Sequence, residues 1–191
     1  MNTSYLFLAE GFEEVEALTV VDILRRSNIP ITTVSITSSI QVKGAHGITV
    51  EADMVYADAD FTGADWLILP GGLPGAPNLA ACEPLCDLLK AQSAKGGNIA
   101  AICASPAVVL APLGILDGKE AICYPGFEGA LTKSRVSGKP VVIDGNIITA
   151  NGPASAMLFA LAIANEIIGP QDATNVAEGL LYYEHQEPFY F

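Results

Sequence analysis

Short apolar runs alternate with amphipathic segments along nearly the whole chain. Strands are predicted where a run is rich in apolar or β-branched residues and ends at turn residues, at positions 4–10, 30–36, 64–72, 97–103 and 121–126. Helices are predicted where apolar residues recur with helical spacing, at positions 12–28, 82–95, 105–114, 153–169 and 171–181. This alternation indicates an α/β fold with a mostly parallel sheet and helices on both faces.

Two hairpins interrupt the alternation. Residues 40–53 predict two short strands about a glycine-rich turn, and residues 140–150 predict a hairpin with Asp144 and Gly145 at the turn. The sequence has no internal repeat, linker or low-complexity segment, so residues 1–191 are expected to form a single domain.

The amino-acid composition of the chain limits the kinds of partner that it is expected to bind. The chain is 51% apolar and only 16% charged, which suits a sheet buried on both faces. Its net charge of −12 argues against binding to nucleic acid or to anionic membranes, because both need clustered Lys and Arg. We therefore expect partners to be small molecules or other proteins.

Neither a secretory signal nor a membrane span is predicted. The N-terminus lacks a basic segment, and its apolar run soon ends in acidic residues. The apolar stretch at residues 99–116 is interrupted by Pro106, Pro112 and Gly114, so it predicts a buried strand and a buried helix. We expect a soluble, cytoplasmic protein whose cysteines are mostly reduced.

Cys103 stands between a predicted strand and the helix that Ser105 and Pro106 begin. A side chain at such a sharp turn is expected to be exposed above the sheet edge, facing a helix N-terminus that favours thiolate. We therefore predict a pKa below the ordinary cysteine value of about 8.5. The alternative is a small buried hydrophobic residue without chemistry, and the position at the junction favours the reactive interpretation.

Glu16 heads a row with Val20 and Leu24, four residues apart on one face of the first helix. A carboxyl on this core-facing row would have a raised pKa and could donate a hydrogen bond to an anion. The alternative, an acidic residue of the first turn in solvent, suits Glu13 and Glu14 better, and the pattern alone leaves both interpretations of Glu16 open.

A glycine-rich turn, LPGGLPGAPN, follows the predicted strand at residues 64–69. Gly71 and Gly72 would let the backbone approach a ligand closely, with N–H groups directed at developing negative charge. The segment matches neither GxxxxGK[ST] nor GxGxxG, so it does not predict a phosphate loop.

Four segments together, AEGFEEVEA, LILPGG, AAICASPAVVLA and TANGPASAMLFALAI, carry a resemblance over most of the chain. The chain resembles the ThiJ/PfpI superfamily, in the branch of the human parkinsonism-associated protein deglycase, the DJ-one branch. The resemblance implies a flavodoxin-like three-layer sandwich and a homodimer. It maps the reactive cysteine onto Cys103, its protonated glutamate partner onto Glu16 and the oxyanion-side glycine onto Gly72, with Gly71 and Ala104 completing the backbone lining.

The chain departs from these relatives at several positions. Ala104 stands where protease-like members have His, which argues against peptidase activity. Tyr124 stands where near relatives often have His, and a phenol with a pKa near 10 is a poor base. His46 and Asn151 replace two arginines of the human relative, so an anion pocket built from them would be weakened.

The remaining candidate residues receive weaker predictions. His46 is either a proton shuttle or a surface turn residue, with the second favoured, and His185 is expected in an aromatic packing strip. Cys82 and Cys86 are four residues apart without evident further ligands, so no metal site is predicted. Cys123 is expected in the core, in a strand beside Tyr124. No cofactor is expected.

Three functions follow from the reactive cysteine and the resemblance. The first is a stress-protective, redox-responsive protein in which peroxide oxidises Cys103 to sulfenic and then sulfinic acid. The second is a cofactor-independent glyoxalase or deglycase acting on methylglyoxal-type dicarbonyls or their protein adducts. The third is a non-catalytic chaperone. The expected partners are a second copy of the chain and a small reactive carbonyl or peroxide.

Overall fold

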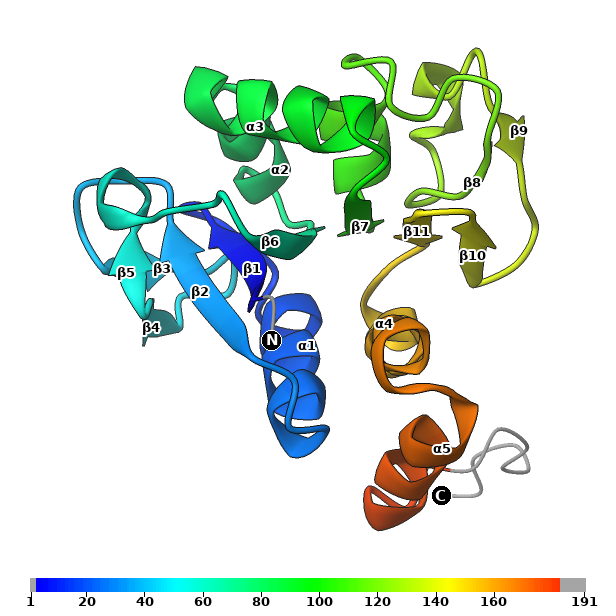
Figure 1. Cartoon of the computed structure of the whole chain (residues 1–191). Coiled ribbons are helices and arrows are strands. Elements are labelled where there is room, and N and C mark those ends of the chain that lie inside the picture. The colour runs from blue at the N-terminus through cyan, green and yellow to red at the C-terminus, as the bar shows by residue number, and fades with distance from the viewer. Residues whose placement is uncertain (1–2, 183–191) are drawn as a thin grey trace.

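A seven-stranded sheet lies between two layers of helices in the computed structural model, which describes residues 3–182 (Figure 1). In spatial order the strands are β10 (Val141–Asp144), β11 (Ile147–Ala150), β7 (Asn98–Ile102), β6 (Ala64–Leu69), β1 (Thr3–Leu8), β2 (Ile31–Ser35) and β5 (Met54–Val55). All neighbours pair in parallel except β10 and β11. The predicted three-layer, flavodoxin-like α/β sandwich is confirmed.

Short elements complete the described part of the chain. Two further pairs of strands are β3 (Gln41–Lys43) with β4 (Thr49–Glu51), and β8 (Glu120–Ala121) with β9 (Arg135–Val136). The α-helices are α1 (Glu14–Arg26), α2 (Gly75–Ala80), α3 (Glu83–Ala94), α4 (Ala156–Ile168) and α5 (Pro170–Gly179). The 3-10 turns are η1 (Tyr56–Asp58), η3 (Glu128–Ala130) and η4 (Pro153–Ser155), and a π-helical segment, η2, spans Pro106–Leu110.

Successive side chains of the strands enter different cores, because strand residues alternate between faces. In β1, Leu6 and Leu8 join the core beneath α1 and α4, whereas Phe7 joins the core beneath α2 and α3. Figure 1 shows α1, α4 and α5 on one side of the sheet and α2 and α3 on the other. Two-sided burial therefore explains the apolar strands of the sequence.

Both predicted hairpins form. In the second, Asp144 pairs with Ile147, so Gly145 and Asn146 make the turn, one residue later than the sequence predicts. Gly145 has a φ of +63°, a left-handed conformation that glycine adopts without steric cost.

Three local predictions are wrong. The glycine-rich turn contains a helix, α2, which the Gly and Pro residues in it concealed. The helix predicted at residues 105–114 is reduced to the five-residue segment η2. The strand predicted at residues 121–126 ends at Ala121, because the Tyr124 N–H donates instead to the carbonyl of Cys103.

Within residues 3–182, no helix combines the length and apolar character that crossing a bilayer requires. The stretch at residues 99–116 forms β7 and η2 instead. His185 lies outside the described residues.

Candidate active site

The candidate site lies beyond the carboxyl ends of three neighbouring parallel strands, β1, β6 and β7. The chain leaving β1 leads into α1 and Glu16, the chain leaving β6 carries Gly71 and Gly72, and the chain leaving β7 carries Cys103. Ligands of open parallel sheets bind at this edge, where the loops of adjacent strands converge. The topology thus brings together residues that are far apart in the sequence.

Cys103 occupies a strained turn directly after β7. Its φ of +65° lies in the left-handed region, which costs a non-glycine residue about 1–3 kcal/mol. The Cys103 N–H donates to the Ala150 carbonyl at 2.9 Å, and its own carbonyl accepts from Tyr124 at 2.8 Å. Ser105 Oγ ties the turn to the Pro70 carbonyl at 2.6 Å. These bonds hold the residue in a conformation that its side chain disfavours.

The Cys103 side chain is less accessible than the sequence predicts. Only 8% of the residue is exposed, so it does not project freely above the sheet edge. It lines a cavity of about 470 Å³ instead. The strand-to-helix turn is confirmed, but the thiol faces a pocket rather than open solvent.

Glu16 is completely buried beside this turn, which favours the core-facing one of the two interpretations that its row with Val20 and Leu24 left open. Its Oε2 accepts a 2.7 Å hydrogen bond from the Gly71 N–H, whereas its Oε1 has no hydrogen-bond partner among the described residues. Burial raises the pKa of Glu16 to about 7, although the Gly71 bond opposes this shift. The carboxyl therefore keeps its proton in much of the neutral range.

The pKa predicted for Cys103 is wrong in direction. Burial of the sulfur, the charge of the Glu16 carboxylate and a hydrogen bond to that carboxylate raise the pKa of the thiol to about 12. The N–H groups of Ala104 and Gly72 lower it by smaller amounts. Since two negative charges cannot share this buried space, the Cys103 thiol keeps its proton when Glu16 ionises near pH 7.

Three backbone N–H groups donate hydrogen bonds to the side chains of Cys103 and Glu16, two to the first and one to the second. Ala104 and Gly72 direct theirs at the Cys103 sulfur, as the resemblance implies. The Gly71 N–H binds Glu16 instead, although the Gly71 backbone also lies against the Cys103 side chain. Gly72 has a φ of +99°, and a Cβ there would lie 2.5 Å from the nitrogen of Glu13, so this position requires glycine.

The backbone of Gly71 lies directly against the side chains of Cys103 and Glu16. A Cβ at this position would lie 2.6 Å from Cys103 Cβ and 2.8 Å from Glu16 Oε2. Real Cβ atoms do not approach heavy atoms so closely. The absence of a side chain at Gly71 is thus what allows Cys103 and Glu16 to lie together.

The cavity has a mixed lining of backbone, aromatic and polar groups. Its wall is formed by Glu13, Ala45, His46, Gly72, Leu73, Cys103, Ala104, Tyr124, Phe127 and Pro153. Tyr124 is 44% exposed, and its ring meets Phe127 edge-on at 6.4 Å between centroids. Asn151 does not line the cavity, and its Oδ1 accepts from Ser155 Oγ at 2.6 Å. The sequence pointed to neither Phe127 nor Pro153 as lining residues.

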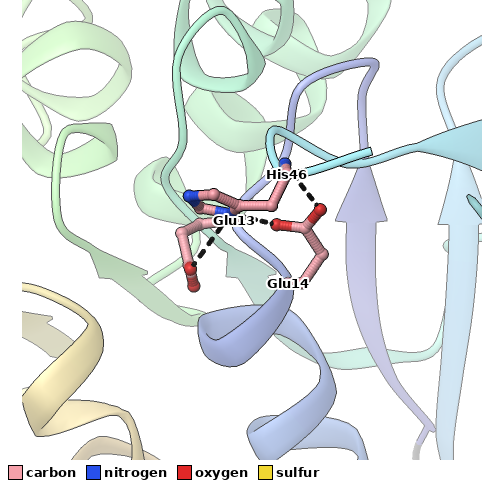
Figure 2. Close-up of side chains that lie close together, drawn as sticks. All are labelled: Glu13, Glu14 and His46. Atoms are coloured by element: carbon pink, nitrogen blue, oxygen red, sulfur yellow. Dashed lines mark hydrogen bonds and ion pairs between the residues drawn. The ribbon is translucent and has the colours of Figure 1, made fainter. Parts of the chain in front are cut away.

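His46 is bound to a carboxyl at the edge of this cavity (Figure 2). Its Nδ1 lies 2.7 Å from Glu14 Oε2, and its backbone N–H donates to Glu14 Oε1 at 2.7 Å. Glu13 Oε1 is 3.8 Å from the same ring nitrogen. The His46 side chain is 69% exposed, as expected for a turn residue, but its ion pair was not predicted.

Glu13 and Glu14 are not the solvent-exposed acids that the sequence predicts. They are 8% and 4% exposed, respectively. Glu13 caps α1 through a 2.7 Å bond from the Glu16 N–H, and Glu14 turns toward the hairpin that carries His46. Helical spacing could not show this, because the partner of Glu14 lies 32 residues away in the sequence.

Glu13, Glu14 and His46 also have ligand atoms within 4.8 Å of one another, the usual spacing of a metal site. Each of the three already bonds to a protein group, as described above. An internal ion pair therefore accounts for this geometry without a metal.

The other cysteines lie outside the cavity lining. Cys86 and Cys123 are buried and Cys82 is half-buried, and all four cysteines are free thiols. Burial raises the pKa of Cys86, and burial together with Glu128 raises that of Cys123 to about 11. Cys123 is a core residue as predicted, although it follows β8 rather than lying in a strand.

Two relatives cover nearly the whole chain. The protein dj-1beta of Drosophila melanogaster is 39% identical over 182 residues, which are 94% of this chain and 97% of that protein. The glutathione-independent glyoxalase DJR-1.2 of Caenorhabditis elegans is 34% identical over 90% of this chain and 91% of its own length. The chain spans only 40% and 44% of the two longer DJ-1 homologues, B and A, of Arabidopsis thaliana.

The fold and the sequence give the same assignment. The structure of oxidized DJ-1 from Toxoplasma gondii superposes with a TM-score of 0.92 at 34% identity, covering 95% of this chain and 99% of that one. Residues 3–166 match the DJ-1/PfpI family. Because this match includes every residue of the site described above, the chain belongs to the DJ-1/PfpI family.

Proposed function

We propose that this protein is a stress-protective, cofactor-independent glyoxalase that converts small 2-oxoaldehydes such as methylglyoxal to hydroxy acids. The observation that carries the proposal is the Cys103–Glu16 pair at a cavity of about 470 Å³, with the N–H groups of Gly72 and Ala104 directed at the sulfur. A relative from Caenorhabditis elegans is named a glutathione-independent glyoxalase, which agrees with it.

The first step is attack of the Cys103 sulfur on the aldehyde carbon. The S–C bond forms as the S–H bond breaks, the thiol proton passes to Glu16, and the C=O electron pair moves to the aldehyde oxygen, which takes up a proton and gives a hemithioacetal. Glu16 can supply this proton, because burial holds its pKa at about 7. Proton and nucleophile are thus provided by one coupled pair.

The second step moves hydrogen between neighbouring carbons. A base removes the proton from the former aldehyde carbon, the electron pair forms an enediol, and the second carbon is then protonated to give a thioester. Water hydrolyses the thioester to the hydroxy acid and returns the thiol. One carbon is oxidised while its neighbour is reduced, so the reaction needs no external electron acceptor.

The test is lactate production from methylglyoxal. Cys103→Ala should lower kcat/KM at least about a hundredfold, because it removes the nucleophile. Cys123→Ala is the matched control, since that thiol lies outside the cavity lining, and it should retain activity. Equal rates for wild type and Cys103→Ala would refute the enzymatic proposal.

A second candidate function is a peroxide response at the same sulfur. The sulfur of the Cys103 thiol attacks one peroxide oxygen, the O–O bond breaks, and the thiol proton leaves with the other oxygen as water. The resulting sulfenic acid reacts with a second peroxide, again releasing water, and gives a sulfinic acid that ionises to the sulfinate. Glu16 and the N–H groups that face Cys103 would stabilise the sulfinate. Mass spectrometry after mild peroxide should find Cys103 oxidised before the other three cysteines, and any other order would contradict this function.

We infer further that the protein acts as a cytoplasmic homodimer, as the resemblance implies. Two exposed apolar residues of α1, Val15 and Leu18, support self-association, being 52% and 40% exposed. Sedimentation should give about twice the chain mass of 19.9 kDa, and a monomer at micromolar concentration would contradict the inference.

A further inference from the structure

We propose that His46, oriented by Glu14, is a second proton-transfer residue of the Cys103 pocket and serves the ketone oxygen of the substrate. The inference rests on the proposed dicarbonyl chemistry and adds a catalytic residue to it. His46 and Cys103 line the same cavity but come from different parts of the fold, the β3–β4 turn and the end of β7.

The carboxyl of Glu14 fixes the orientation of the imidazole. Its two oxygens bind both the ring Nδ1 and the backbone N–H of His46, each at 2.7 Å, so ring and backbone are held by one buried group. With Nδ1 committed to Glu14, the other ring nitrogen, Nε2, lies on the opposite edge of the ring (Figure 2). A carboxylate that binds one nitrogen of a histidine in this way sets which nitrogen is available for proton transfer.

The chemistry requires two separate proton positions. Glu16 lies against Cys103 and Gly71, where it can serve the aldehyde end of the substrate. When the proton leaves the aldehyde carbon, electrons move onto the ketone oxygen, which must gain a proton to form the enediol. Nε2–H of His46 donates that proton, which stays on this oxygen as the hydroxyl of the product. When the second carbon is protonated, the former aldehyde oxygen releases its proton as it becomes the thioester carbonyl. His46 then takes up a proton from solvent, so the histidine is unchanged after one cycle.

The surrounding charges favour the protonated form of His46. A hydrogen bond from the ring to Glu14 and the charges of Glu14 and Glu13 raise its pKa. The other titratable groups of the cavity are Cys103 and Tyr124, and Lys43 is the nearest basic side chain on the same hairpin. Among the residues that line the cavity, His46 alone can carry a positive charge. It is therefore the group best placed to act as an acid near neutral pH.

The first experiment compares two substitutions of His46. His46→Gln removes both charge and proton transfer, and His46→Arg keeps the charge but cannot release a proton at usable pH. Both should lower kcat for methylglyoxal about tenfold or more, while iodoacetamide alkylates Cys103 at the wild-type rate. His185→Gln, at the only other histidine of the chain, is the control and should keep wild-type activity.

The second experiment uses the wild-type protein and does not depend on variants folding. The pKa of His46 from NMR titration should equal the pKa of the basic limb of kcat/KM, above which activity falls. Glu14→Gln should shift both to lower pH, because Glu14 is the main cause of the raised pKa. Different values for the two pKa measurements would overturn the proposal.

The two proposals fail in different ways. If Cys103→Ala is inactive while His46→Gln keeps the wild-type kcat and pH profile, the glyoxalase function stands and the role of His46 is refuted. Full activity of His46→Arg also refutes proton transfer, since charge alone would then suffice. If Cys103→Ala is as active as wild type, the glyoxalase function itself fails.

Discussion

Glu14 and Glu16 stand two residues apart at the start of α1, and both are almost completely buried, yet their carboxyls behave in opposite ways. Burial raises the pKa of Glu16 to about 7. Burial acts in the same direction on Glu14, but hydrogen bonds from the side chain and backbone of His46 and from the backbone of Ile48 outweigh it and lower the pKa. One carboxyl is therefore a proton donor and the other a fixed negative charge.

The difference lies in the partners and not in the helix. Glu14 points to the β3–β4 hairpin, which supplies an imidazole and two backbone donors. Glu16 points to the glycine loop after β6, where a single N–H and a thiol meet it. The fold thus assigns opposite protonation states to two identical side chains by placing them against different loops.

Replacing Glu16, whose buried Oε1 has no hydrogen-bond partner among the described residues, should have the largest effect on the free energy of unfolding. The folded-state pKa of Glu16 is raised from 4.5 to about 7, so wild-type stability falls as pH rises through this window and is flat above it. At 1.36 kcal/mol per pKa unit the full effect is about 3 kcal/mol. Urea unfolding of Glu16→Gln should therefore show a gain over wild type that grows from pH 4.5 to 7.

The same variant should lose glyoxalase activity, since Gln cannot donate the proton. A gain in stability that does not depend on pH would contradict the raised pKa and remove the contrast between the two carboxyls.

Separating Glu16 from Cys103 should have the next largest effect on the free energy of unfolding. Gly71→Ala places a methyl group against both side chains and should cost about 2 kcal/mol in the free energy of unfolding. Activity should fall as well, because the pair is forced apart. Gly63→Ala is the matched control, since a Cβ there meets nothing within 4 Å, and equal stabilities for the two variants would show that the loop yields.

Glu14→Gln tests the paired carboxyl and should act with the opposite sign. Because the folded-state pKa of Glu14 is lowered, its stabilising effect is present above the ordinary pKa of 4.5 and is lost as pH falls through the folded value. We expect a loss of about 1 kcal/mol at pH 7, since Gln keeps an acceptor but loses the charge and His46 faces solvent. Thermal unfolding at pH 7 and pH 3 measures the difference, which should be smaller at the lower pH.

The smallest effect is expected at Tyr124, the remaining titratable group of the cavity. Tyr124→Phe keeps the ring and its edge contact with Phe127, so kcat for methylglyoxal should stay within about twofold of wild type. A tenfold loss would show that the phenol transfers protons and would place a third acid beside Glu16 and His46.

Patterns within single segments predicted the frame of this site. The strand-to-helix position of Cys103 follows from local spacing and is confirmed by the structure. Spacing also placed Glu16 on a row with core residues, but it left the burial of its carboxyl open. Burial of Glu13 and Glu14, the turn of the Gly71 N–H toward Glu16 and the ion pair of His46 were missed. Each of these features depends on contacts between loops that are distant in the sequence. The spacing of residues within one segment cannot predict such contacts.

The prediction of a low pKa for Cys103 was wrong for a similar reason. The helix N-terminus was visible in the sequence and does supply the Ala104 N–H, but the dehydration of the sulfur and the nearness of a carboxylate were not. The short helix α2 was hidden because its glycine and proline residues are typical of turns.

Gly71 limits how closely other atoms can approach the reactive pair. Since this residue has no side chain, the loop after β6 can pass directly beside both the Cys103 side chain and the Glu16 carboxyl. The spacing of the reactive pair therefore leaves no room for an added atom at position 71, where even one methyl group would disturb it.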